Sequence, residues 1–581
     1  MKQVESVAGE KAVDVQVDHD SYTASESESK LSGWERFKDS FRRQDQGYED
    51  LDPDLSDVER AAILTARAPL SRTLQGRHLQ MIAIGGSIGT GLFVGAGSKL
   101  STGGPAGVLI AYSLIGSLTY VTCQAVGELT VTFPVAGAYI TFPTRFIDPS
   151  WGFAMSWNVA MSCLIGFPLE LVAASMTIRY WNPDVNPAAI IVVFYVFICS
   201  INFFGVKGYG EAEFVFSSIK ITAIIGFILF GIIVVCGGGP SHEYLGARYF
   251  HDPGAFANGF KGVCAVFVSA AYSFAGTEAV GLVAAETENP RKTIPKATKQ
   301  VFWRVLLFYI ISLLMVGLLV PYTDPRLLSG SSFVDAKASP FVLAIVDAGV
   351  KGLPSVINAV ILVAVLSVGN ADIFIASRVL SALAAANHAP KIFGYIDKNG
   401  RPLFGIIAAS LTGALCFLVG TGKDMTIFNW LLSVSGLSAL FNWGSICLCH
   451  IRVRRALKSQ GRSTDELAFT AQTGEYGSYY GIILCILVII AQFWVALFPI
   501  GGKPNAADFF MAYLSFPIVL FFYVSHKIWH KNWRLYIRAK DIDVDTGRRD
   551  TDFDLLKQEL AEERKELSQR SFLYRTWNFW C

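Results

Sequence analysis

The stretch Ile84-Gly-Gly-Ser-Ile-Gly-Thr-Gly-Leu-Phe93 decides the fold of this chain, because it places four glycines among seven residues of an apolar segment. Glycine loses much backbone freedom on becoming helical, so a helix is weak here. A break would expose backbone N–H groups at the start of a second half-helix, and these favour an anion such as a carboxylate. The small residues equally suit close packing between helices, so both interpretations stay open at this point.

The rest of the chain indicates a membrane protein. Of its 581 residues, 52% are hydrophobic and 17% are charged, whereas about 25% are charged in soluble domains. Twelve apolar segments are each long enough to cross a hydrocarbon core of about 30 Å. They cover residues 79–100, 106–133, 152–178, 187–205, 211–236, 259–285, 301–320, 352–384, 404–421, 426–450, 478–499 and 508–527. We predict an all-α integral membrane protein of twelve helices, since backbone groups in a bilayer must be paired within helices or covered by protein or water.

The polar parts of the chain predict its topology. Residues 1–75 form an acidic, serine-rich tail that we expect to be solvated, residues 76–527 hold the twelve helices, and residues 528–581 form a second polar tail. If the N-terminus is cytosolic, the inner loops carry about twice as many Lys and Arg residues as the outer loops. We therefore predict a multi-pass protein with both termini in the cytosol.

Several classes of function lack a sequence signal. The net charge of +2 creates no field that would attract nucleic acid. The chain has no G-x-x-x-x-G-K-[ST] phosphate loop, no H-E-x-x-H zinc motif and no C-x-x-C pair, so neither ATP-driven pumping nor a metal site is indicated. No nucleophile is paired with a base. We therefore expect no enzyme activity and no cofactor.

A second break is predicted in the sixth apolar segment, at Ser273-Phe-Ala-Gly-Thr-Glu278. Its freed groups would include the carbonyls that end the first half-helix, and these suit a cation or an ammonium group. Two broken spans that lie five segments apart are expected of a transporter built from two inverted repeats of five helices. Helices 11 and 12 would then be additions to the repeats.

Ionisable residues inside membrane spans are costly and usually functional. The candidates here are Glu128, Glu170, Lys220 and Glu278. Glu278 adjoins the predicted second break. Lys220 lies nine residues into its segment, too deep for its ammonium to reach the interface easily, so it needs a carboxylate or backbone carbonyls nearby. For each candidate the alternative is a buried structural pair or an interfacial side chain.

Four further ionisable residues are predicted to have structural roles. Glu211 and Glu213 open the fifth segment, so we expect them to lie at the interface. Asp372 and Arg378 lie toward the end of the eighth segment, and we expect them to be structural.

Several of these stretches resemble a known family. Gly86-Ser-Ile-Gly-Thr-Gly-Leu-Phe93 resembles the first-span motif of amino acid permeases in the APC superfamily. Phe274-Ala-Gly-Thr-Glu278, followed by Ala285-Glu-Thr-Glu-Asn-Pro-Arg-Lys292, resembles the fungal amino acid permeases. Stretches similar to general amino acid permeases of that family are Lys299–Arg304, Gly317–Tyr322, Val365–Asn370, Asp554–Gln558 and Trp577–Cys581. The likeness covers essentially residues 70–581.

The resemblance implies a LeuT-like fold and proton-coupled uptake of L-amino acids at the plasma membrane. The residues that it implies for the substrate carboxylate are Ser87, Ile88, Gly89, Thr90 and Gly91. Those that it implies for the substrate ammonium, through carbonyls, and for gating are Phe274, Ala275 and Gly276. The Lys220 ammonium would take the place of sodium in sodium-coupled relatives, which favours protons as the driving ion. Glu278 is the best protonatable partner, and Glu128 and Glu170 complete the expected coupling set.

Small residues in the tenth segment, among them Ser433 and Gly436, leave room for varied side chains and favour a broad-range amino acid/proton symporter. Two alternatives remain open. One is a narrow permease of the same family, for proline, basic or aromatic amino acids. The other is a transporter that doubles as an amino acid-sensing receptor.

The resemblance also implies regulation through the tails. It implies ubiquitin acceptance at Lys2, Lys11 and Lys30, control of endocytosis at Leu555 and Leu556, and palmitoylation of Cys581. The expected partners are therefore protons, membrane lipids and ubiquitin-ligase machinery besides the amino acids, with trafficking to the endosome and vacuole. Residues 553–567 are predicted to form a helix that packs on the cytosolic ends of the bundle.

Overall fold

The fold comes from a computed structural model that describes residues 32–44, 74–86, 88–135, 137–240, 242–287, 290–328, 339–421 and 424–548, and residues 63, 562, 565 and 569–571. Two compact units are distinguished, residues 1–42 and 43–581. The first contains the short helix α1 (Gly33–Asp39). Over the described residues the second unit is helical, and its only β-pairing is two isolated bridges.

All twelve predicted apolar segments fall on helices. The first is interrupted, and the second follows it without a loop. The helices in chain order are α3 (Gly76–Gly85), α4 (Thr90–Phe93), α5 (Gly95–Thr132), α7 (Pro149–Ile178), α8 (Pro187–Phe203), α9 (Gly205–Val235), α10 (Gly259–Phe274), α11 (Ala279–Leu282), α12 (Pro290–Arg304), α13 (Ser312–Leu319), α16 (Leu353–Ala385), α17 (Leu403–Gly413), α18 (Asp424–Ser459), α19 (Gly474–Leu497), α20 (Ala506–Tyr513) and α21 (Ser515–His530). Shorter helices include α6 (Ala138–Phe146), α14 (Pro325–Leu328) and α15 (Pro340–Asp347).

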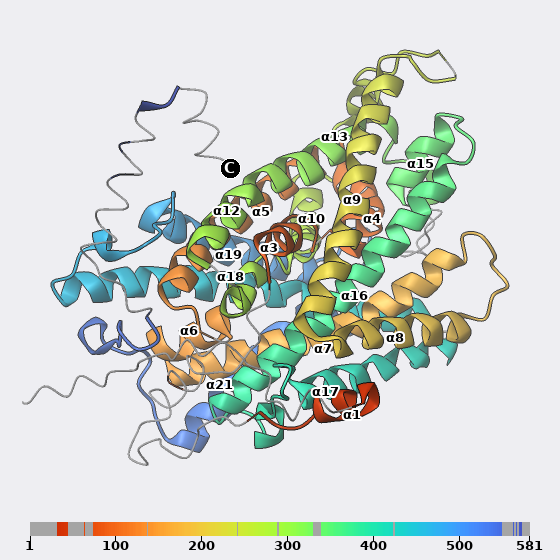
Figure 1. Ribbon diagram of the computed structural model, residues 1–581. Coiled ribbons are helices and arrows are strands. Elements are labelled where there is room, and N and C mark those ends of the chain that lie inside the picture. The colour runs from red at the N-terminus through yellow and green to blue at the C-terminus, as the bar shows by residue number, and fades with distance from the viewer. Residues whose placement is uncertain are drawn as a thin grey trace, which may run out of the picture. The chain divides into compact units, whose positions relative to one another are not determined.

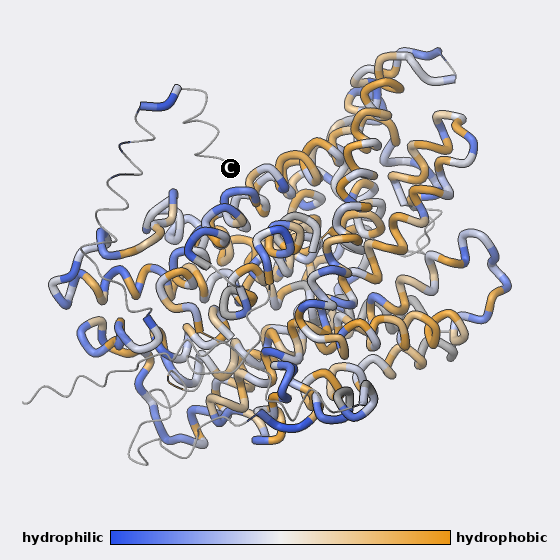
Figure 2. The backbone as a smooth tube through the Cα atoms, viewed as in Figure 1, coloured by the Kyte–Doolittle hydropathy of each residue, from blue (hydrophilic) through white to orange (hydrophobic). Residues whose placement is uncertain are grey.

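The apolar helices are of several lengths. Within the described residues, seven are long and apolar enough to cross a membrane, and the pair α20 and α21, bent by 64°, passes the same criterion when the two are counted together. Two shorter apolar helices are α8 and Leu403–Phe417. The hydrophobic residues run along the helices, whereas hydrophilic residues gather in loops and at helix ends (Figure 2). This is the pattern of a multi-span membrane protein, while the count of twelve crossings stays a prediction for the short and interrupted helices.

Gly104 separates the first two spans inside α5. Its φ of 73° lies in the left-handed region, and a Cβ there would come within 2.7 Å of the Ala255 carbonyl oxygen. Pro105 follows at once and fits the first turn of the next helix. Helix α5 is therefore kinked at Gly104, between the first two predicted apolar segments.

Helix packing repeats between the two halves of the bundle. Helix α3 packs on α9, as α10 packs on α18. Helix α7 contacts α8 and α17, and α16 contacts α17 and α8 in the same way. The two central helices α7 and α16 pack against each other (Figure 1). Two related five-helix units are expected to produce such matching helix contacts. The positions of the two predicted breaks, five segments apart, indicate the same two units.

Burial separates the inner helices from the outer ones. The apolar window of α16 is 72% buried and that of α7 is 67% buried, whereas those of α9 and α19 are 28% buried. Helices α9 and α19 therefore present apolar side chains outward, as a lipid-facing helix does. The interior between α7, α16 and the interrupted helices is where a site can form.

A segment after α21 packs back onto the bundle, and we call residues 532–548 the C-terminal strap. The Ile537 N–H donates to the Ile147 carbonyl at 2.8 Å. Arg145 donates to the Thr546 carbonyl at 2.8 Å, and Gln460 donates to the Ile542 carbonyl at 2.8 Å. The predicted tail helix over 553–567 lies outside the described residues.

Candidate functional site

The first span is interrupted where the glycine-rich stretch predicted a break. Helix α3 ends at Gly85 and α4 begins at Thr90. The glycines were interpreted as either a helix break or a site of close helix packing, and the structure shows both at this position. A Cβ at Gly89 would lie 2.3 Å from Val368 Cγ2, and one at Gly91 would lie 2.6 Å from Ser273 Oγ. Helix α4 therefore sits directly against α16 and α10.

The sixth span is interrupted between Phe274 and Ala279. Gly276 has a φ of 86°, a left-handed conformation that favours glycine. The Thr277 hydroxyl donates to the Phe274 carbonyl at 2.6 Å, and Arg304 donates to the same hydroxyl at 2.6 Å. These contacts hold the turn open as a defined non-helical segment.

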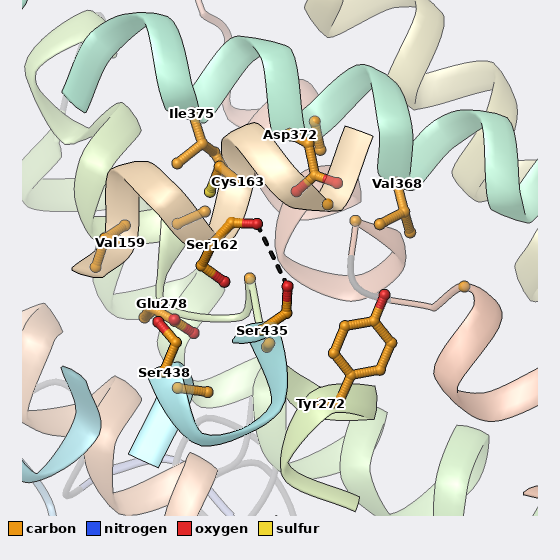
Figure 3. A pocket seen from close by; sticks show the side chains of 18 of the residues that line it. Val159, Ser162, Cys163, Tyr272, Glu278, Val368, Asp372, Ile375, Ser435 and Ser438 are labelled. Atoms are coloured by element: carbon orange, nitrogen blue, oxygen red, sulfur yellow. Dashed lines mark hydrogen bonds between the residues drawn. The ribbon is translucent and has the colours of Figure 1, made fainter. Parts of the chain in front are cut away.

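The two breaks face one partly open cavity, whose empty space is about 940 Å³ when the adjoining open solvent is included. Part of its wall comes from the breaks themselves, namely Gly86, Gly89, Thr90, Gly91, Ala275, Gly276, Glu278 and Ala279. Most of the remaining wall comes from α7, α16, α18 and the end of α10, and Ile82 of α3, Tyr139 of α6 and Tyr209 of α9 complete it. Figure 3 shows Val159, Ser162 and Cys163 of α7, Val368, Asp372 and Ile375 of α16, and Ser435 and Ser438 of α18 around this space.

Glu170 of α7 connects the two interrupted spans. One of its carboxylate oxygens accepts a hydrogen bond from the Thr90 hydroxyl, and the other accepts one from the Tyr272 hydroxyl at 3.0 Å. Its side chain lines the cavity and is 1% exposed. Glu170 thus ties the start of α4 to the last turn of α10, so it fixes the spacing of the two breaks.

Lys220 of α9 lies behind the first break. Its ammonium donates to the Gly85 carbonyl at 2.6 Å and to Ser367 Oγ at 2.8 Å, and it lies 3.4 Å from Glu213 Oε1. The carboxylate and the carbonyl that the sequence required are therefore both present. Lys220 does not line the cavity itself.

Glu213 corrects one sequence expectation. It was predicted to lie at the interface, but it is fully buried, and Ser217 and Ser367 donate hydrogen bonds to its carboxylate. The reason is that α9 begins at Gly205, six residues before the predicted start of the segment. Glu211 does lie nearer the surface, where it pairs with Arg77 at 2.8 Å.

Glu278 stands at the second break and lines the cavity. Asn442 of α18 donates to its Oε1 at 3.3 Å, and its Oε2 has no hydrogen-bond partner among the described residues. The side chain is only 6% exposed. A carboxylate with a free oxygen at this position can take up or release a proton beside a bound ligand.

Comparison with known proteins agrees with this geometry. The model of the family described as "Amino acid permease" matches residues 78–539. The general amino-acid permease GAP2 of Candida albicans is 59% identical over 97% of this chain and 96% of its own length. The general amino-acid permease GAP1 of Saccharomyces cerevisiae is 55% identical over 95% of this chain and 92% of its own length. The histidine permease of the same yeast is 48% identical over 88% of this chain.

The chain belongs to the amino acid permease family. The residues matched by the family model span both breaks and all the cavity walls. The relatives are transporters rather than enzymes, in line with the sequence expectation.

Two other predicted residues of the permease lie away from the cavity. Glu128 forms an ion pair with Arg454 at 2.5 Å and accepts a hydrogen bond from the Ala471 N–H at 2.6 Å. Ile88 is fully buried in the hydrophobic core. Neither lines the cavity, so any part they play acts through the surrounding structure.

Phe274 also lies outside the cavity, although it was expected to gate it. Its ring is fully buried and packs against Tyr309 with ring centroids 4.1 Å apart. Among the side chains that the structure describes, the aromatic residues that line the permease cavity are Tyr139, Tyr209 and Tyr272. Sequence reasoning missed Tyr272, although its place two residues before Phe274 was a usable signal.

Several predicted residues lie outside what the structure describes. These are Ser87, the side-chain surroundings of Ser433 and Gly436 in α18, and the tail residues Lys2, Lys11, Lys30, Leu555, Leu556 and Cys581. Their roles stay predictions. The neighbouring α18 residues Ser435 and Ser438 do line the cavity. Among the described residues, no group of His, Cys, Asp or Glu is arranged to hold a metal ion.

Proposed function

We propose that this permease is a broad-range amino acid/proton symporter that imports amino acids across the plasma membrane, with both termini in the cytosol. The observation that carries the proposal is the meeting of two opposed helix breaks at one cavity. The break before Thr90 presents the N–H end of a half-helix, and the break after Phe274 presents the carbonyl end of another. These are the two poles that a zwitterion needs.

The chemistry of each pole fits one end of an amino acid. The N–H groups at Gly89, Thr90 and Gly91 would donate hydrogen bonds to the carboxylate, and the positive end of a helix dipole stabilises an anion there. The carbonyls near Ala275 and Gly276 would accept the ammonium. Every amino acid shares these two groups, so the breaks supply affinity without choosing among side chains.

The rest of the cavity supports a broad range. Small residues dominate its walls, among them Ser162, Gly166 and Ala371. Relatives named general permeases reach 55–59% identity, whereas those named for histidine and tryptophan reach 48–50%. This favours a general over a narrow specificity.

Lys220 and Glu278 support proton coupling. The Lys220 ammonium already occupies the carbonyl site behind the first break, so a sodium ion there would be repelled. Glu278 offers a free carboxylate oxygen beside the ligand space. One proton crossing about 150 mV yields about 3.5 kcal/mol, and two pH units add about 2.7 kcal/mol. Together they sustain a concentration ratio of roughly 10⁴.

The test is uptake in cells that lack their own amino acid permeases. Labelled neutral, acidic and basic amino acids and proline are supplied with and without a protonophore. We expect uptake of every class, and we expect the protonophore to abolish accumulation. Uptake of a single class would contradict the broad range, and accumulation that resists the protonophore would contradict proton coupling.

A further inference from the structure

Asp372 of α16 stands out among the three carboxylates that line the cavity. Glu170 accepts hydrogen bonds from Thr90 and Tyr272, and Glu278 accepts one from Asn442. The Oδ2 of Asp372 is buried and has no hydrogen-bond partner among the described residues. The described lining contains no Lys, Arg or His that could balance it.

The buried cations that contact α16 or lie on it are engaged elsewhere. Arg378 forms an ion pair with Glu286 at 2.6 Å. Lys220 bonds the Gly85 carbonyl and Ser367 and faces Glu213. The sequence expectation that Asp372 is a structural residue therefore finds no supporting partner. Figure 3 shows its carboxylate directed into the cavity from α16, with Tyr272 and Ser435 across the space.

The position of Asp372 relative to the first break is defined by its neighbours. On α16, Val368 contacts Gly89, and Asp372 lies four residues further along. On α7, Glu170 bonds Thr90, and Gly166 lies four residues before it and faces Asp372. Four residues of helix rise about 6 Å. Asp372 thus lies one helical turn beyond the break that would hold the ligand carboxylate.

Gly166 leaves the room that this carboxylate uses. A Cβ at Gly166 would lie 2.5 Å from Asp372 Oδ2, so a larger residue would displace the side chain. The observed position of the Asp372 carboxylate in the cavity wall therefore depends on the absence of a side chain at residue 166. A ligand side chain that extends one helical turn from the break ends beside it.

We propose that Asp372 is a specificity-determining residue that binds the cationic side chain of basic amino acids, a role that rests on the proposed amino acid import. An ionised carboxylate without a partner is costly in a wall of low dielectric constant. A guanidinium or ammonium group removes that cost and forms charge-assisted hydrogen bonds, bidentate in the case of guanidinium. A neutral side chain of equal length gains neither.

The test compares arginine with citrulline, its neutral analogue of the same shape, as competitors of labelled alanine uptake. In the unaltered permease we expect arginine to compete at least tenfold more strongly than citrulline. In Asp372→Asn we expect the arginine advantage to fall at least tenfold, with citrulline shifted less than threefold. The matched control is Asp508→Asn, which removes an exposed aspartate outside the cavity and should keep the arginine advantage.

Each outcome decides the proposal. Equal competition by arginine and citrulline in the unaltered permease overturns it without requiring any variant to fold. An arginine advantage that survives Asp372→Asn overturns it as well, as does loss of alanine uptake in a variant present at the cell surface in normal amount. Failure of the unaltered permease to take up alanine would instead contradict the proposed import function, so the two failures are distinguishable.

Discussion

Lys220 and Glu213 are both fully buried, and their ion pair lies next to the first break. Replacing Lys220 by Met removes the donor to the Gly85 carbonyl and leaves the Glu213 carboxylate without its cation. Loss of one partner of a buried pair costs about 3–5 kcal/mol. We therefore expect Lys220→Met to lower the Tm of the purified permease strongly and to slow transport.

The double variant Lys220→Met with Glu213→Gln is expected to recover most of that Tm, because no uncompensated charge is left. The matched control is Arg248→Met, which breaks an exposed pair with Glu243 whose side chains are 56% and 59% exposed. Exposed pairs contribute about 0–1 kcal/mol, so its Tm should barely change. A double variant no more stable than Lys220→Met would show that the charge of Glu213 is not the cause.

The role of Glu278 in proton coupling can be tested by replacing its carboxylate with an amide. Glu278→Gln keeps the side-chain size and the acceptor oxygen for Asn442, but it removes the group that binds a proton. We expect protonophore-sensitive accumulation to be lost, while exchange of labelled for unlabelled amino acid across the membrane continues. Accumulation at the normal rate in this variant at the cell surface would rule out Glu278 as the coupling carboxylate.

For single residues, the sequence predicted burial correctly where the position of the residue within its apolar segment determined it. Lys220 was singled out because it lies nine residues into its predicted segment, and the structure supplies its partners. Glu213 was misplaced because depth was counted from the apolar run rather than from the helix start at Gly205. The free oxygen of Asp372 was not accessible to sequence reasoning, because it depends on which helices face α16.

At the element scale, the first break depends on glycines that let α4 touch α16. Gly89→Ala would place a Cβ 2.3 Å from Val368 Cγ2 and push the two helices apart. Overpacking of this kind costs about 1–3 kcal/mol. We expect the apparent KM for amino acids to rise at least tenfold, because the N–H groups of the break shift away from the ligand, and uptake kinetics measure this.

Two companion variants make that result specific. Adding Val368→Ala to Gly89→Ala removes the clashing methyl group and should restore much of the affinity. Gly226→Ala is the matched control, since nothing lies within 4 Å of a Cβ at that helical position of α9. Its transport should equal that of the unaltered permease. Failure of Val368→Ala to improve Gly89→Ala would mean that the glycine serves something other than this contact.

The two interrupted helices could be predicted because clustered glycines are a local signal. How these helices are tied together could not, because it depends on residues far apart in sequence. Glu170 bonds Thr90 of α4, which lies 80 positions before it, and Tyr272 of α10, which lies 102 positions after it. Arg378 bonds Glu286, which lies 92 positions before it. The sequence marked Glu170 and Arg378 as ionisable groups inside predicted spans but did not show their partners.

On the scale of the whole molecule, the C-terminal strap holds the ends of several helices together. Its side chains Ile542 and Val544 are 3% and 1% exposed. Arg462, in the segment after α18, forms an ion pair with Asp545 at 2.6 Å, and Arg145 at the end of α6 lies 3.5 Å from Asp543. The sequence identified residues 528–581 only as a second polar tail and did not predict the strap, because the few apolar residues that anchor it are too scattered to form a pattern.

Deleting the strap should therefore destabilise the permease, whereas deleting the chain beyond it should not. Burying one aliphatic side chain contributes about 1.5–3 kcal/mol, so removal of residues 532–581 loses two such contributions and leaves the Arg145 guanidinium, which is 3% exposed, without Asp543. Removal of residues 549–581 keeps all of these contacts. We expect a clear drop in Tm for the longer deletion alone, and equal melting of the two would show that the strap contributes nothing.

Asp543→Asn probes the same contact without deletion. Burial alone would raise the pKa of Asp543, but hydrogen bonds from the N–H groups of Thr546 and Asp545 and the charge of Arg145 hold this pKa below its usual value. A carboxyl with a lowered pKa stabilises the fold above the pKa that it has when unfolded, and this contribution disappears as the pH falls through the lowered pKa. The Tm difference between the permease and Asp543→Asn should thus be present at pH 7 and shrink on acidification. A difference that is constant with pH would assign the effect to packing rather than to charge.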